Sequence, residues 1–326
     1  MVDAYTSKDY VAFTLRVLPD LFAPALDVLA DMLLRPALEP DAVALEQDVV
    51  CEEIQEALDT PEERLHDAYA ARLYGGHGRG RPILGTPESV RSFTPDLLRE
   101  EHARFFAAPN VVLSVAGRVG PAVTEHIQRV FADLPTAPGA AGAQDDPASS
   151  DLSLPDAALP DADAREADEL VLESPIVQTY FEIGNLAVSA HHPDRVPVLL
   201  LSNLLGGGMS SRIFQAVRER EGLAYTIYTY ADMGRDVGMV SCAGSCSPDK
   251  EARVREVVAT EYRRLLDEGP TAAELASNQA QIKSHLVFAL EGTHNQMSRA
   301  AKNEMYYGRF IPMSELMARV DGVTRE

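Results

Sequence analysis

The sequence is poor in basic residues, and this shortage limits what it can bind. Its 326 residues include 29 lysines and arginines against 50 aspartates and glutamates, which gives a formal net charge of −21 at pH 7. Proteins that hold a nucleic-acid backbone neutralise its phosphates with lysine and arginine side chains. The charge balance therefore argues against a nucleic-acid partner.

Cysteine pairs and long apolar runs are missing as well. The three cysteines, Cys51, Cys242 and Cys246, form no CxxC pair, so the sequence predicts neither a disulfide framework nor a thiolate zinc site. No stretch approaches the roughly 18 consecutive apolar residues of a membrane span, and no basic region followed by an apolar one comes after Met1. We expect no membrane partner, and a cytoplasmic location is slightly favoured.

Several short motifs that would mark a catalytic site are also lacking. The glycine-rich stretch Gly206–Ser211 has no GK[ST] ending for phosphate binding, and Ser210 has no trailing glycine for a GxSxG nucleophile turn. The eight histidines include no pair three or four residues apart. The sequence therefore contains no local two-histidine zinc motif, and the glycines are expected to form a turn.

The length and the distribution of charge predict two domains joined by a linker. A chain of this size is long enough for two domains that each bury a core. The stretch Gln144–Glu169 holds nine acidic residues and one basic residue among many alanines and prolines, a composition typical of an extended connector. We expect a first domain over residues 1–134, an acidic linker over 135–168 and a second domain over 169–326.

The pattern of apolar residues predicts an α+β fold in each half. Period-two segments are typical of strands, and period-3.6 segments with proline or hydroxyl starts are typical of helices. Strands are expected over 10–17, 111–116, 176–183, 225–230 and 237–242, and helices over 21–33, 41–58, 61–73, 193–205, 212–219 and 271–290. Further helices are expected to start at Thr86-Pro87, Thr94-Pro95 and Ser247-Pro248, another should end near Phe131, and Thr271–Glu274 forms a capping box. Each half should form an antiparallel sheet with helices on one face. The segment Leu113–Pro121 echoes Val240–Pro248, which suggests that the two domains are duplicates.

Two carboxylates in the helix predicted over 41–58 are candidate site residues. At about 100° per residue, Glu46 and Glu53 fall within the apolar arc that includes Val43, Val50 and Ile54. An unpaired carboxylate on a buried face is costly. An ion-pair partner, a bound cation or a hydrated edge of the helix could each explain the two acids, and periodicity alone favours the hydrated edge.

A second candidate site lies where a charged helix runs into a strand rich in tyrosine. Arg218 lies in the predicted helix, and Tyr225 opens the strand after Gly222. Arginine and tyrosine donors at the end of a strand could face a cleft and bind a carbonyl or carboxylate group. An ordinary surface arginine and a core tyrosine are an equally good interpretation of the sequence alone.

Five segments, taken in order, resemble the pitrilysin/insulinase family of zinc metallopeptidases, especially its processing-peptidase-like members. The resemblance spans essentially the whole chain, and five motifs in the order of the family are more specific than any one of them. The segments are Asp3–Asp9, Leu45–Ile54, Pro82–Thr86, Asn110–Gly117 and Leu204–Phe214 together with Val217–Tyr225.

The resemblance implies a function and a role for each candidate residue. It implies that two similar domains form a clamshell chamber in which a peptide or an unfolded protein segment is cut. Glu53 matches the family's zinc-binding glutamate, and Glu46 matches the glutamate that supports it. Arg218 and Tyr225 match the pair that holds substrate and stabilises the tetrahedral intermediate. The implied cofactor is zinc.

The sequence departs from the family at the HxxEH motif, which supplies two histidine ligands and the catalytic base. That motif belongs upstream of Asp3, and the chain starts at Met1. We expect a chain shortened at its N-terminus, and at its C-terminus too, with negligible peptidase activity and poor zinc retention alone. The alternative is a non-catalytic homologue that serves as a partner or peptide-binding subunit of an active peptidase, as a homodimer or a heterodimer.

Overall fold

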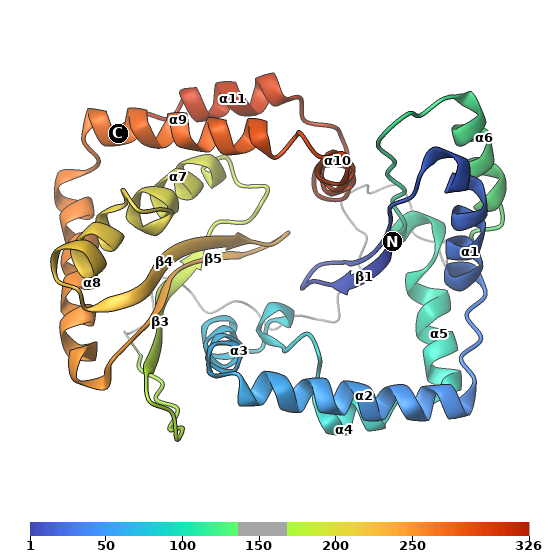
Figure 1. The fold of residues 1–326 in the computed structure, drawn as a ribbon, viewed down its shortest axis with the longest axis horizontal. Coiled ribbons are helices and arrows are strands. Elements are labelled where there is room, and N and C mark those ends of the chain that lie inside the picture. Colours follow the sequence, from blue (N-terminus) through green and yellow to red (C-terminus); the bar gives the residue numbers. More distant parts are fainter. Residues whose placement is uncertain (136–167, 326) are drawn as a thin grey trace. The chain divides into compact units, whose positions relative to one another are not determined.

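The computed structural model describes residues 1–135 and 168–325, and these confirm the predicted α+β class (Figure 1). Both sheets in the described part are antiparallel. The predicted linker over 135–168 lies almost wholly outside the described residues, so that domain division stays a prediction. The described residues form two compact units.

The first unit combines a small hairpin with short helices. It comprises residues 1–56, the described part of 82–156, and 292–305. Its hairpin pairs Val2 with Leu15 at one end and Thr6 with Val11 at the other. Its elements are β1 (Val2–Thr6), β2 (Val11–Leu15), α1 (Phe22–Leu34), most of α2 (Pro40–Asp59), α4 (Pro87–Arg91), α5 (Pro95–Phe105), α6 (Pro121–Val130) and most of α10 (Thr293–Tyr307).

The strand predicted over 111–116 is wrong. This segment belongs to neither sheet of the described residues, although it is a short apolar run of the kind found in buried strands. Leu113 is 45% exposed and Val115 is 38% exposed. A strand exists only when another strand satisfies its backbone groups, and no ladder in the described part reaches this segment. The echo with Val240–Pro248 therefore has no counterpart in the secondary structure.

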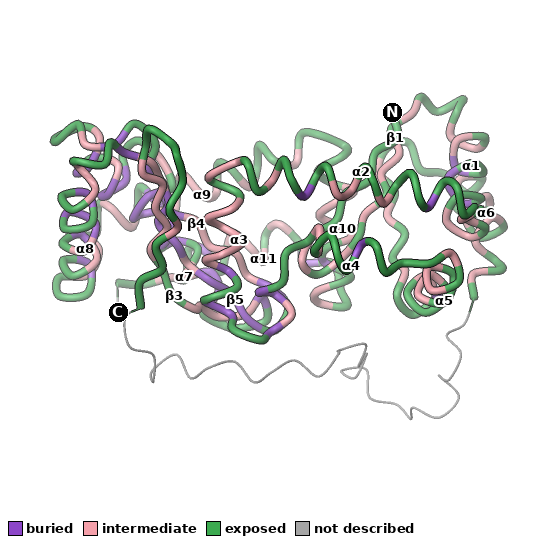
Figure 2. The backbone as a smooth tube through the Cα atoms, turned by 90° about the horizontal axis from the view of Figure 1, so that it is seen from below, coloured by how far each residue is buried: buried purple, intermediate pink, exposed green. Residues whose placement is uncertain are grey.

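The second unit is built on a three-stranded sheet in the order β3-β5-β4, covered by helices. Buried leucine, isoleucine, valine and cysteine side chains form a continuous core against one face of this sheet. Figure 2 shows buried residues concentrated around α7, α8, β4 and β5. The elements are α3 (Pro61–Tyr74), β3 (Thr179–Ala187), α7 (Arg195–Gly206), a π-helix (Phe214–Arg220), β4 (Ala224–Met233), β5 (Gly238–Cys246), α8 (Glu251–Glu268), α9 (Ala272–Phe288) and α11 (Met313–Asp321).

Helix α3 comes from the first half of the chain but packs in the second unit. Its residues Leu73 and Tyr74 are buried in one cluster with Val237 and Met239. The short 3-10 turn that follows is tied to the same unit, because the His77 ring contacts the Asp236 carboxylate at 2.9 Å. Residues distant in sequence therefore complete the core of the second unit.

Candidate functional site

The candidate site in the second unit begins with a π-helix. Ala216 and Val217 of this helix are buried in the core, so Arg218 on the next position lies at its half-exposed side. The chain then reverses at Gly222, whose φ of 59° favours glycine. The Gly222 amide donates to the Arg218 carbonyl at 3.1 Å, which fixes the turn into β4. Single π-turns occur often at functional sites.

Tyr225 owes its position to a β-bulge. Ala224 pairs with Cys246 and Thr226 pairs with Ser245, so Tyr225 is an extra residue between two successive pairs of the ladder. A bulge re-aims the side chain of the inserted residue. The Tyr225 side chain is accordingly 78% exposed, although both neighbouring strand positions are paired.

The structure brings Arg218 and Tyr225 together. The Arg218 guanidinium carbon lies 4.6 Å from the centre of the Tyr225 ring and 4.9 Å from that of Phe214. The nearest acidic contact of Arg218 in the described part is Glu219, at 3.9 Å, which is longer than a hydrogen bond. The guanidinium and the phenol are therefore two neighbouring donor groups at the surface, available to a carbonyl or carboxylate.

The two candidate glutamates of α2 lie at the surface, which corrects their placement on the buried face and agrees with the hydrated-edge interpretation. Glu46 and Glu53 are both exposed, whereas Val43 and Ile54 are buried. The predicted apolar arc was too wide, because Val50 is only partly buried and the neighbouring Val49 is 41% exposed. The buried stripe is narrow, and the two acids lie beside it. The catalytic and metal-binding roles expected for Glu46 and Glu53 stay predictions.

The described residues do not fit a zinc ion by themselves. Within residues 1–135 and 168–325, no group of three or more His, Cys, Asp or Glu side chains is placed to hold a metal. A protein zinc site needs at least three protein ligands, and Glu53 offers one carboxylate. We therefore derive no catalytic step through zinc from this chain.

A buried polar cluster beneath α3 was not predicted from the sequence. The Glu182 carboxylate on β3 is only 3% exposed, accepts a hydrogen bond from the Tyr230 hydroxyl and lies 3.3 Å from His66 Nδ1. Burial, and next the Glu182 carboxylate, raise the pKa of Tyr230. Nearby, the Tyr228 hydroxyl donates to Glu62 at 2.9 Å, and burial raises the pKa of Tyr228 to about 12.

The sequence contained one signal for this cluster, which was the acidic residue Glu182 between the apolar residues Phe181 and Ile183 of the strand. Such an acid ordinarily points to water. Here the face on which it lies is covered by α3, which comes from more than a hundred residues upstream. The cluster attaches α3 to the sheet, and its contacts give it a structural role.

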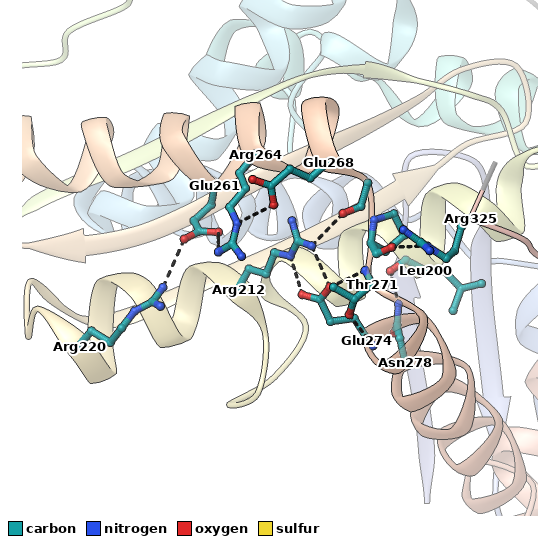
Figure 3. A network of polar contacts seen from close by, with 12 residues as sticks. Leu200, Arg212, Arg220, Glu261, Arg264, Glu268, Thr271, Glu274, Asn278 and Arg325 are labelled. Carbon is teal, nitrogen blue, oxygen red and sulfur yellow. Dashed lines mark hydrogen bonds and ion pairs between the residues drawn. The ribbon is translucent and has the colours of Figure 1, made fainter.

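A second polar network surrounds Arg212 (Figure 3). The Arg212 guanidinium, almost fully buried, donates to both Glu274 oxygens at 2.7 and 2.8 Å and to the Gly269 carbonyl at 3.0 Å. The hydrogen bond from Arg212 lowers the pKa of Glu274 to about 2. Glu274 also completes the predicted capping box with Thr271 at the start of α9. This network fixes the α8–α9 corner and supports the helix beside Arg218.

None of the helices in the described part combines the length and the apolar character needed to cross a membrane.

Comparison with protein families gives two matches that together cover most of the chain. Residues 1–87 match the family described as insulinase (peptidase family M16), and residues 92–282 match the domain described as the peptidase M16 inactive domain.

Two bacterial proteins are similar to this chain over nearly its whole length. The chain is 31% identical over 325 residues to the uncharacterized zinc protease YmxG of Bacillus subtilis (strain 168), covering 100% of this chain and 75% of the relative. It is 30% identical over 323 residues to an uncharacterized zinc protease of Streptomyces coelicolor, covering 99% of this chain and 69% of the relative.

Solved structures share the fold. A peptidase M16 inactive domain from Pseudomonas fluorescens superposes with a TM-score of 0.82 at 21% identity, over 100% of this chain and 75% of that one. A protease from Helicobacter pylori superposes with a TM-score of 0.80 at 21% identity, over 98% and 78% of the two chains.

Proposed function

Because the chain belongs to the insulinase (M16) family of peptidases, we propose that it acts in peptide hydrolysis and that its second unit holds the substrate through Arg218 and Tyr225. One observation carries this proposal. An arginine and a tyrosine are stacked at the surface, with the tyrosine turned outward by a bulge and no carboxylate within hydrogen-bond distance of the arginine in the described part.

The two donors suit a peptide carbonyl. The Tyr225 hydroxyl and the Arg218 guanidinium can each donate to a carbonyl oxygen, and such donors bind most strongly when that oxygen gains negative charge. One donor of this kind contributes about 10² to 10³ in rate. In this proposal the substrate is an extended peptide or an unfolded segment, because only exposed main-chain carbonyls can reach the pair.

Hydrolysis requires groups that these 326 residues do not encode. The sequence contains no HxxEH motif, and the described residues do not assemble a zinc site. We propose that the zinc ligands and the general base come from an HxxEH-bearing segment, joined to this chain or carried by a partner subunit. Glu53 is then the ligand proposed from this chain, with Glu46 in support.

The genomic DNA upstream of codon 1 distinguishes these two arrangements. In-frame codons for HxxEH would identify one continuous peptidase. An early in-frame stop would exclude the continuous peptidase. A partner subunit that carries HxxEH should then co-purify with this chain. A stable chain that purifies with no such subunit and binds no peptide would contradict both.

Metal analysis and peptide binding test the chain itself. We expect much less than one zinc per chain and negligible cleavage of fluorescein-labelled β-casein, but measurable binding of that probe by fluorescence anisotropy. Arg218→Ala should weaken binding about tenfold, while Tyr5→Phe, a tyrosine of the first unit, should not change it. One tightly held zinc per chain would refute the requirement for added ligands.

An active form that carries HxxEH tests the individual roles. Tyr225→Phe should retain zinc and slow turnover about 10²-fold, because one oxyanion donor is lost. Glu53→Gln should lower the zinc content. Unchanged turnover in the Tyr225→Phe enzyme would remove Tyr225 from the mechanism.

A second candidate function, a non-catalytic partner subunit that binds peptides, is favoured by a specific observation. The longer family match, residues 92–282, is to a domain described as inactive. Such a subunit would keep peptide binding through Arg218 and Tyr225 while cleavage occurs on the partner. Cleavage by the isolated partner at the full rate would argue against it.

A further inference from the structure

Phe214 lies next to the Arg218 and Tyr225 pair, four residues before Arg218 in the same π-helix. We propose that Phe214 is a positioning residue, whose ring holds the Arg218 guanidinium beside Tyr225 so that both donors meet the same peptide carbonyl. This proposal rests on the proposed substrate-binding function of the pair. It gives a role to a residue that ends one of the family-like segments but for which the sequence predicted none.

The Phe214 ring is itself fixed. It is half-buried and packs against the core cluster that contains Val217 and Leu205. One edge of the ring therefore faces a close-packed interior, which leaves little freedom for the ring to move. The Arg218 guanidinium carbon lies 4.9 Å from its centre, within the range of a cation–π contact.

Arg218 has little else to hold it. Its side chain is 36% exposed, and the Glu219 carboxylate at 3.9 Å is itself half-exposed, so this ion pair is weak. Tyr225, its other ring contact, is 78% exposed and has no core behind it. Phe214 is therefore the contact that connects the donor pair to the rigid interior, and a free arginine side chain would sample many rotamers.

Replacing the ring tests the proposal. Phe214→Leu keeps an apolar side chain on the core but removes the ring, and we expect labelled β-casein to bind about fivefold more weakly. Phe214→Tyr and Phe214→Trp retain a ring and should restore most of the affinity. The Trp variant would also place the single tryptophan of the chain at the site, because the unmodified sequence contains none.

A double-mutant cycle separates positioning from general damage. If Phe214 acts through Arg218, Phe214→Leu should have no further effect on binding when Arg218→Ala is already present. Phe181→Leu is the matched control, because Phe181 packs on the same core cluster without a ring contact to Arg218. It should change the thermal midpoint as much as Phe214→Leu does, and leave binding unchanged. Equal losses from Phe214→Leu with and without Arg218 would overturn the proposal.

A measurement without peptide keeps the two proposals distinct. In a chain labelled with ¹³C,¹⁵N-arginine, the Arg218 side-chain protons should be shifted upfield by the neighbouring rings, and Phe214→Leu should move them toward random-coil values. If the unmodified chain binds no β-casein, the proposed function fails and this shift alone decides the role of Phe214. An Arg218 spectrum unaffected by Phe214→Leu would overturn the positioning role.

Discussion

The two compact units bury apolar surface very unequally. Of the 31 buried hydrophobic residues in the described part of the chain, seven belong to the first unit and the rest to the second. The first unit has a two-stranded sheet, and such a hairpin is marginal alone in water. The second unit has three strands with helices packed over them. The stability of the chain therefore depends chiefly on the second unit.

The second unit obtains part of its core from the other half of the sequence. Helix α3 contributes Leu73 and Tyr74, although it belongs to the first half of the chain. A boundary drawn at the acidic linker would separate these residues from their packing partners. The order of residues along the sequence thus differs from their grouping into the two units. Three experiments test how much the stability of the chain depends on contacts within the second unit.

The largest effect is expected at Leu73. Leu73→Ala removes a side chain that is 6% exposed from the core of the second unit, and should lower the free energy of unfolding by about 3 kcal/mol. Leu58→Ala is the matched control on α2, where the side chain is 49% exposed, and should change it by less than about 0.5 kcal/mol. Urea unfolding measures both. Similar losses from the two variants would show that burial in the second unit does not set the stability.

A smaller, pH-dependent effect is expected at Glu274. Arg212 lowers the pKa of Glu274 from its ordinary 4.5 to about 2, so the folded state favours the ionised carboxylate. This stabilisation is complete above pH 4.5 or so and is lost as the pH falls toward 2. Glu274→Gln should therefore cost about 1–3 kcal/mol at pH 7, because the buried Arg212 loses its charged partner.

The difference between the Glu274→Gln variant and the unmodified chain should shrink steadily between pH 4.5 and pH 2. Glu268→Gln is the control, because Glu268 and its partner Arg264 are both well exposed. Thermal midpoints measured across this pH range test the expectation. A difference between Glu274→Gln and the unmodified chain that stays constant down to pH 2 would show that the charge of Glu274 is not the cause.

The smallest effect is expected when the chain is cut between Ala148 and Ser149 at an introduced protease site. The two pieces should stay together in gel filtration, because α3 of the first piece is buried in the second unit. Leu73→Ala should promote their separation, and Leu58→Ala should not. Complete separation of the unmodified pieces at micromolar concentration would show that α3 contributes little to the second unit.

Local signals predicted most of the helices. Thr86 and Thr94 each precede a proline at the first turn of α4 and α5, and Thr271 precedes Ala272 at the start of α9; each hydroxyl accepts the expected backbone hydrogen bond. These features depend on neighbours within one helical turn. Sequence alone is sufficient for them.

Contacts between residues distant in sequence could not be predicted. Residues 111–116 form an apolar run like that of a buried strand, but a strand depends on a partner that composition does not reveal. The burial of Glu182 depends on α3, which local sequence does not indicate. The exposure of Glu46 and Glu53 could not be predicted, because apolar periodicity does not tell which valines pack. The sequence alone left Arg218 and Tyr225 equally well explained as a site or as ordinary residues, and the family resemblance decided between these, because their proximity depends on a π-helix and a bulge that no short sequence pattern predicts.

The bulge at the start of β4 makes the position of the Tyr225 side chain sensitive to the length of the chain. The β4–β5 ladder accommodates one surplus residue there, so removing a single position before Tyr225 would restore regular pairing and turn the phenol to the opposite side of the strand. A descendant with such a one-codon loss outside the core cluster would still encode every buried side chain of that cluster. It would nevertheless have lost the hydroxyl from the place where a ligand could meet it.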